Sequence, residues 1–237
     1  MRGSGVLYRP RCVSYYATGD QSSAARTAPT PTLLTGGGST TDATSFATAS
    51  ISPAADQPIY AAVISQATSV NTPTATGNGL TWVAVATGAP NASRKLTVFR
   101  SAGASPSAGA ITFDFAGQTQ SSAQWAVIQF ASADITGTNG SGATVQAPAA
   151  TTGTGVTSLA GPTLAALENS LNVNLTFVGL GLNTAVTNDA LFAELSDAGQ
   201  NTATLRLETQ WAANQTVCTS TFSASDATAI SIEVKAG

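Results

Sequence analysis

The sequence of 237 residues contains no histidine, only two cysteines, and few charged residues, which make up 9% of the chain. Without histidine there is no Ser-His-Asp or Cys-His triad and no histidine ligand for a metal ion. Two cysteines are too few for a disulfide framework. The net charge of −3 argues against nucleic acid as the main partner. The commonest hydrolase, zinc and nucleic-acid-binding classes are therefore not expected.

The chain also lacks long apolar runs and nucleotide-binding signatures. No segment reaches the roughly 18 consecutive apolar residues of a membrane span. Residues 1–16 lack the apolar core of a secretory signal peptide. No GxGxxG or GxxxxGK[ST] loop is present to cradle phosphates. We therefore predict a protein made in the cytoplasm, with no membrane or nucleic-acid partner, no cofactor and no metal ion.

Alternating apolar and polar residues predict β-strands along most of the chain. Helical periodicity is confined to residues 164–170, which would form one or two turns. The predicted strands are residues 46–52, 58–67, 80–87, 95–102, 109–117, 122–132, 171–182, 190–197, 203–212, 216–225 and 229–236.

This strand pattern occurs twice. The two alignments are residues 79–103 with 189–213, separated by 110 residues at Leu80 and Ala190, and residues 121–132 with 226–237, separated by 103 residues at Val127 and Ile230. Two tandem sandwiches, or one domain built from two related halves, would each account for the repeat. We predict the second, because each half alone has only about five strands.

The fold class that follows is all-β, a jelly-roll-like antiparallel β-sandwich over residues 46–237. Its pseudo-repeats are residues 46–135 and 163–237, and both are expected to contribute strands to shared sheets. Residues 1–45 are expected to lie outside the sandwich as an extended N-terminal arm and linker, because Pro, Gly, Ser and Thr dominate residues 20–45.

The arm is basic and aromatic. Four of the nine basic residues lie in the first 26 positions, namely Arg2, Arg9, Arg11 and Arg26. Either the arm is a solvated tail, or it docks on an acidic partner. Its candidate contact residues are Leu7, Tyr8, Arg9, Arg11, Cys12, Tyr15 and Tyr16.

The two cysteines lie in different surroundings. Cys12 lies next to Arg11, and a basic neighbourhood makes a thiol more reactive. Cys218 lies within a predicted strand, where a buried cysteine usually serves as inert packing. Three states remain open: two free thiols, an internal Cys12–Cys218 disulfide, and a disulfide from Cys12 to another chain.

Few residues offer catalysis or metal binding. Glu194, Glu208 and Glu233 lie on predicted strands, and two carboxylates are enough for a glycosidase. We interpret them instead as outward acids that protect edges or aid solubility, and we predict no enzyme. Asp134 and Asn139 are too few ligands for calcium.

Three tryptophans, with Tyr60, are the candidates to stack on a sugar ring. Trp82 and Trp125 alternate with apolar residues and are predicted to lie in the core. Trp211 ends its predicted strand near a loop, so it is the candidate for ligand stacking.

The order of residues resembles a group of phage-encoded β-sandwich virion structural proteins over about residues 46–237. The stretches that carry the resemblance are GNGLTWVAVAT, RKLTVFRSAG, ITFDFAGQTQSSAQWAVIQF and LETQWAANQTVCTSTFSASDATAISIEVKAG. The resemblance implies a non-enzymatic head decoration or cement protein, or a minor tail component. It would be located in the virion in many copies, with the major capsid protein or other virion proteins as partners.

The composition is compatible with that role, because a surface poor in charge is weakly repelled by its neighbours in a dense assembly. The alternative functions are a carbohydrate- or receptor-binding module of a tail or cell surface, and a sandwich glycosidase.

Overall fold

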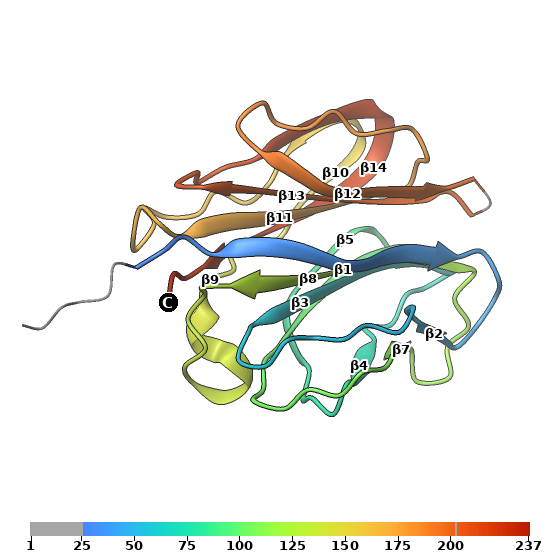
Figure 1. The fold of residues 1–237 in the computed structure, drawn as a ribbon. Helices are drawn as coiled ribbons and strands as arrows, with labels where there is room; N and C mark the ends of the chain where they lie inside the picture. The colour runs from blue at the N-terminus through green and yellow to red at the C-terminus, as the bar shows by residue number, and fades with distance from the viewer. Residues whose placement is uncertain (1–25, 202) are drawn as a thin grey trace, which may run out of the picture.

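Figure 1 shows the computed structural model of the chain, which describes residues 26–201 and 203–237. None of the helices in this part is long and apolar enough to cross a membrane. The elements are β1 (Thr30–Ser39), β2 (Ser45–Ala47), β3 (Ile59–Gln66), β4 (Thr74–Gly77), β5 (Val83–Asn91), β6 (Arg94–Ser101), β7 (Ile111–Asp114), β8 (Ser122–Ala131), the 3-10 helix η1 (Thr138–Ala143), β9 (Thr144–Gln146), β10 (Thr151–Ala160), β11 (Val173–Leu180), β12 (Ala193–Gln200), β13 (Leu205–Ala213) and β14 (Thr219–Val234).

The strands form three antiparallel sheets stacked as layers (Figure 1). The first sheet has the order β1-β8-β3-β6-β5 and lies in the middle. The second has the order β10-β14-β11-β13-β12, with β9 also paired to β14, and the small third sheet has the order β2-β7-β4. The predicted all-β sandwich is confirmed. The expectation that the two halves share sheets is wrong, because each sheet takes its strands from one half only.

The predicted repeat is present in the topology. The first and second sheets have the same strand order, with β1, β3, β5, β6 and β8 replaced in turn by β10, β11, β12, β13 and β14. The separation of 110 residues relates Val83, which begins β5, to Ala193, which begins β12. The separation of 103 residues is out of register, because Val127 faces the third sheet whereas Ile230 faces the core between the two main sheets.

The two halves pack face to face over one shared core. The first sheet contributes Tyr60, Ala62, Ile64, Leu96, Val98, Ala126, Ile128, Phe130 and the nearby Ala133, and the second contributes Val173, Leu175, Phe177, Leu205, Leu207, Ile230, Ile232 and Val234. The opposite face of the first sheet packs on the third sheet to form a second core. Strand β3 is therefore apolar on both faces, as its continuous apolar sequence predicts.

The expected linker over residues 20–45 is wrong for Thr30–Ser39, which forms β1 and pairs with β8 along its length. The composition conceals this strand because β1 is an edge strand whose side chains are mostly exposed or half-buried, so Thr, Pro and Gly suffice. Leu34 packs against the second core. The arm residues from Leu7 to Tyr16 lie outside the described residues.

Beyond their last residues, the equivalent strands β8 and β14 pair with each other. Ala133 and Ala236 form an isolated antiparallel bridge. The amide of Asp134 donates to the carbonyl of Lys235, and the amide of Gly237 donates to the carbonyl of Ser132, both at 2.9 Å. Reciprocal pairing of equivalent strand ends is the arrangement expected near a two-fold axis.

Each outer strand of the two main sheets is irregular. Register shifts interrupt the pairing of β1, β5, β10 and β12 with their inner neighbours. The pairings of β3 with β6 and β8, and of β11 with β13 and β14, run without a shift. Bulges at edges disfavour the addition of further strands to a sheet.

Candidate functional site

No three His, Cys, Asp or Glu side chains gather to hold a metal ion within the described residues. Asp134, one of the two calcium candidates, accepts a hydrogen bond from the Thr136 amide at 2.7 Å, and its other oxygen lies 3.8 Å from Lys235 Nζ. Partial burial would raise the pKa of Asp134, but the Thr136 hydrogen bonds and Lys235 lower it. The carbonyl of Asn139 accepts from Arg100 Nε at 3.2 Å. These groups are already paired, and a neighbouring lysine opposes calcium.

The tryptophans belong to the two cores. Trp125 is buried in the second core, and Trp82 packs against it while its Nε1 donates to the carbonyl of Gly77 at 3.2 Å. Trp211 is half-buried against the shared core instead of lying on a loop rim. Tyr60 is fully buried, its hydroxyl lies 2.8 Å from Thr144 Oγ1, and burial raises its pKa to about 12. Tyr60 and Trp125 are therefore closed to a ligand, whereas Trp82 and Trp211 keep part of their rings exposed.

The interpretation of the three glutamates as outward surface acids holds only for Glu194, which is exposed. Glu208 and Glu233 do point to the outer face of the second sheet, but both are 0% exposed. Strand alternation correctly places their direction. It does not reveal that other segments cover this face, so the prediction of solvent exposure is wrong.

Glu233 is surrounded by donors. One carboxylate oxygen accepts from Asn172 Nδ2 at 2.6 Å and from the Glu168 amide at 2.9 Å, and the other accepts from Gln146 Nε2 at 2.5 Å. A buried carboxylate is stable when donors of this kind replace its water. Glu233 therefore joins β14 to β9 and to the loop before β11.

Glu208 has the opposite environment. Neither of its side-chain oxygens has a hydrogen-bond donor among the described residues. Its ladder neighbours are Asp197 on β12 and Val178 on β11. Burial, reinforced by the negative charges of Asp197 and Glu194, raises the pKa of Glu208 to about 10. Glu208 therefore carries a proton at neutral pH, and it can donate that proton to the carboxylate of Asp197.

A polar layer continues from Glu208 beneath the covering segments. Gln210 Nε2 donates to Ser220 Oγ at 2.8 Å, and its Oε1 accepts from Cys218 Sγ at 3.6 Å. Thr176 Oγ1 lies 2.9 Å from Ser231 Oγ. The sequence pattern gives the outward direction of these side chains, but not the residues that cover them.

Cys218 is buried, and burial raises the pKa of its thiol to about 12. Cys218 and its neighbour Val217, which is 37% exposed, lie just before β14, so the predicted placement of Cys218 within a strand is wrong. Cys12, the other half of the possible disulfide, lies outside the described residues. The packing role predicted for a strand cysteine fits Cys218.

We expect Cys218 to resist thiol reagents in the folded protein. In a Cys12→Ser background, labelling at pH 7 should be about a hundredfold slower, or more, than in denaturant, because modification requires local opening. Mass spectrometry of timed samples measures both rates. Labelling of native Cys218 as fast as that of denatured protein would contradict its burial.

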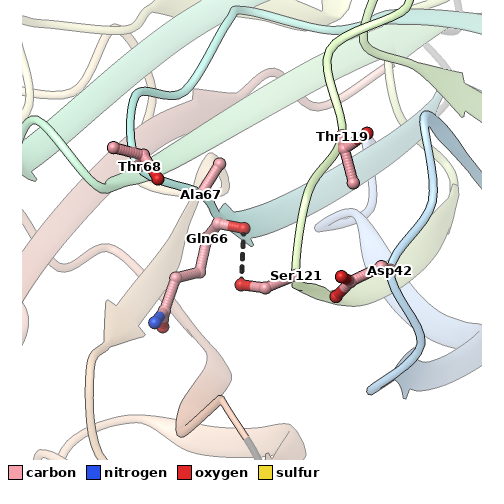
Figure 2. Close-up of a pocket in the computed structure, with 6 residues that line it drawn as sticks. All are labelled: Asp42, Gln66, Ala67, Thr68, Thr119 and Ser121. Carbon is pink, nitrogen blue, oxygen red and sulfur yellow. Dashed lines mark hydrogen bonds between the residues drawn. The ribbon is translucent and has the colours of Figure 1, made fainter.

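One pocket lies at one end of the first sheet and has a volume of about 500 Å³. Its lining residues, drawn in Figure 2, are Asp42, Gln66, Ala67, Thr68, Thr119 and Ser121. Ser121 Oγ donates to the carbonyl of Gln66 at 3.0 Å, and the Gln66 side chain accepts from Arg94 Nε at 3.3 Å. The pocket thus offers one carboxylate and two threonine hydroxyls, with no aromatic ring among its lining residues.

Comparison with models of protein families, with curated proteins and with solved structures finds no match for this chain. The sheet topology of the described residues defines an all-β sandwich of three layered sheets, two of which repeat one strand order.

Proposed function

We propose that the protein is a non-enzymatic structural protein of a phage virion, which decorates or cements the capsid through its sandwich and its N-terminal arm. The strongest support for this proposal is the position of the N-terminal arm relative to β1. The basic, aromatic residues 1–25 precede β1, an edge strand of the middle sheet, by four residues in the sequence. A segment next to an edge strand can supply contacts to a neighbouring protein, as in β-augmentation.

Two further features support a passive role. The buried carboxyl groups of Glu208 and Glu233 lie under covering segments and line neither pocket that the structure describes. The irregular outer strands oppose edge-to-edge polymerisation, so the sandwich can be present at high local concentration without forming fibres. In this proposal, contacts with other virion proteins come from the faces of the sandwich and from the N-terminal arm, and not from the sheet edges.

The arm is tested by deleting residues 1–25, which leaves β1 intact. We expect the sandwich to fold with an unchanged circular dichroism spectrum, and particle incorporation to fall about tenfold or more, because the multivalent contacts are lost. The matched control replaces residues 1–25 with a Gly/Ser segment of equal length. Quantitative mass spectrometry of purified particles measures the copies. Normal incorporation of both variants would contradict an anchoring arm.

The second candidate, a carbohydrate- or receptor-binding module, is favoured by the polar pocket beside Asp42. Carboxylate and hydroxyl groups are suited to sugar hydroxyls, although this pocket lacks a ring for stacking. A glycan array with the intact chain and an Asp42→Ala variant distinguishes the two functions. Binding that Asp42→Ala abolishes would favour the module over the structural role.

A further inference from the structure

Residues 181–192, here called the cover loop, lie against the outer face of the second sheet. Val186 of this loop packs with Val178 and Phe222 in a small apolar cluster. Val178 is the ladder neighbour of Glu208. The cover loop thus helps to close the apolar side of the space around the protonated carboxyl group.

The side chains that hold the cover loop are the neighbours of Glu208. Arg206 Nη2 donates to the carbonyl of Asn183 at 2.5 Å, and Asp197 Oδ2 accepts from the Val186 amide at 3.4 Å. Glu194 Oε2 accepts from Asn188 Nδ2 at 3.1 Å, and Gln210 Oε1 accepts from the Asp189 amide at 3.1 Å. Two backbone hydrogen bonds between Thr187 and Thr221 complete the attachment.

Negative charge predominates around Glu208. Asp197 and Glu194 face it from β12, and Arg206 on its own strand is paired with Asp197. The covering segments bring Asp189 and Cys218 to the same region, and β11 contributes the uncharged Val178. If Glu208 lost its proton, a second carboxylate would stand opposite Asp197 with no hydrogen bond to stabilise it, and Arg206, whose charge favours the ionised form, is already paired with Asp197.

We propose that the cover loop opens as the pH rises, because loss of the Glu208 proton places an uncompensated charge beneath it. Opening admits water to Glu208 and relieves the repulsion between its carboxylate and that of Asp197. The released proton goes to solvent. At acidic and neutral pH the carboxyl group of Glu208 is uncharged, and the loop stays closed.

The steepness with which loop opening depends on pH follows from the difference in the pKa of Glu208 between the closed and the open loop. An open loop returns Glu208 to the pKa of a hydrated carboxyl, whereas the closed loop holds it near 10. Between these values the opening equilibrium should increase about tenfold for each pH unit. Cys218 does not titrate in this range, because burial raises its pKa to about 12.

Hydrogen exchange of the intact chain from about pH 6 to about pH 9 tests the proposal. The reporters are the amides of Val186 and Asp189, corrected for the intrinsic pH dependence of exchange. The reference is the amide of Thr48, which is bonded to Ile111 in the third-sheet region. We expect opening at the reporters to rise about tenfold per pH unit, while the reference stays flat.

Two variants test whether the proton that controls loop opening is the one on Glu208. Glu208→Gln keeps the size of the side chain but cannot ionise, so its reporters should show no rise with pH. Asp56→Asn is the matched control: it removes an exposed acid in the first half of the chain, which takes no part in holding the cover loop, and should keep the wild-type slope. A flat wild-type profile, or an equal slope in Glu208→Gln, overturns the proposal. The wild-type comparison with Thr48 decides the question even if a variant does not fold.

Discussion

Residues 144–237 expressed alone should be unfolded, although they contain every strand of the second sheet. Eight residues of the shared core belong to this half: Val173, Leu175, Phe177, Leu205, Leu207, Ile230, Ile232 and Val234. Each loses about 1.5–3 kcal/mol when its buried side chain returns to water. The combined loss matches or exceeds the total stability of a typical domain, which is about 5–15 kcal/mol.

The first half should behave differently. Residues 26–143 keep the second core between the middle and third sheets, which includes Phe99, Phe113 and Trp125. This fragment should keep partial structure but expose the apolar inner face of β3, β6 and β8, and so aggregate. Circular dichroism and proton NMR of both fragments, with the intact chain as control, give the answer. A cooperative thermal transition in isolated residues 144–237 would contradict a shared core.

Glu208→Gln and Glu233→Gln should change the free energy of unfolding in opposite directions at pH 7. Folding forces Glu208 to take up a proton, which costs about 3 kcal/mol at this pH, and a glutamine avoids that cost. We expect Glu208→Gln to be more stable than wild type by up to this amount. In Glu233→Gln an amide NH₂ replaces an oxygen that accepts hydrogen bonds, so we expect a loss of about 1–3 kcal/mol.

The pH dependence of the free energy of unfolding shows whether the proton on Glu208 causes the expected gain in stability of Glu208→Gln. The folded-state pKa of Glu208 is raised from 4.5 to about 10, so below about pH 4.5 the carboxyl is protonated in both states and adds no dependence. Between these values the folded protein holds one proton more than the unfolded chain. The free energy of unfolding should therefore decline by about 1.36 kcal/mol per pH unit, until cover-loop opening hydrates Glu208. Urea unfolding at several pH values measures the slope, which Glu208→Gln should lack.

Most strands of the sandwich could be predicted because they alternate, or are continuously apolar, over four residues or more. Strands β4, β9 and β10 were not predicted, and the two strands predicted over residues 216–225 and 229–236 are the single strand β14. The repeat could be predicted from the same patterns, although a shift of one residue misplaced Val127 relative to Ile230. Strand β1 could not be predicted from the sequence, because an exposed edge strand needs few apolar residues. The assignment of each half to its own sheet could not be predicted, because side-chain alternation does not specify which strands pair.

The candidate site was less accessible to prediction. Alternation gave the outward direction of Glu208 and Glu233, but their burial depends on segments that are distant in sequence, such as the cover loop around Val186. Those segments have no strong periodicity. The sequence also does not predict that Glu233 is hydrogen-bonded whereas Glu208 is not, because this depends on donors such as Asn172 that the fold brings to one acid and not to the other.

The reciprocal pairing of Ala133 with Ala236 has a consequence for how this architecture arises. Two-fold pairing of identical strand ends is what a homodimer of a single half would form. Joining the halves covalently makes their association independent of protein concentration, which a homodimer cannot achieve. It also frees each copy to diverge. In this chain the first half carries a third sheet on its outer face, and the second half carries a covered layer of acids and amides.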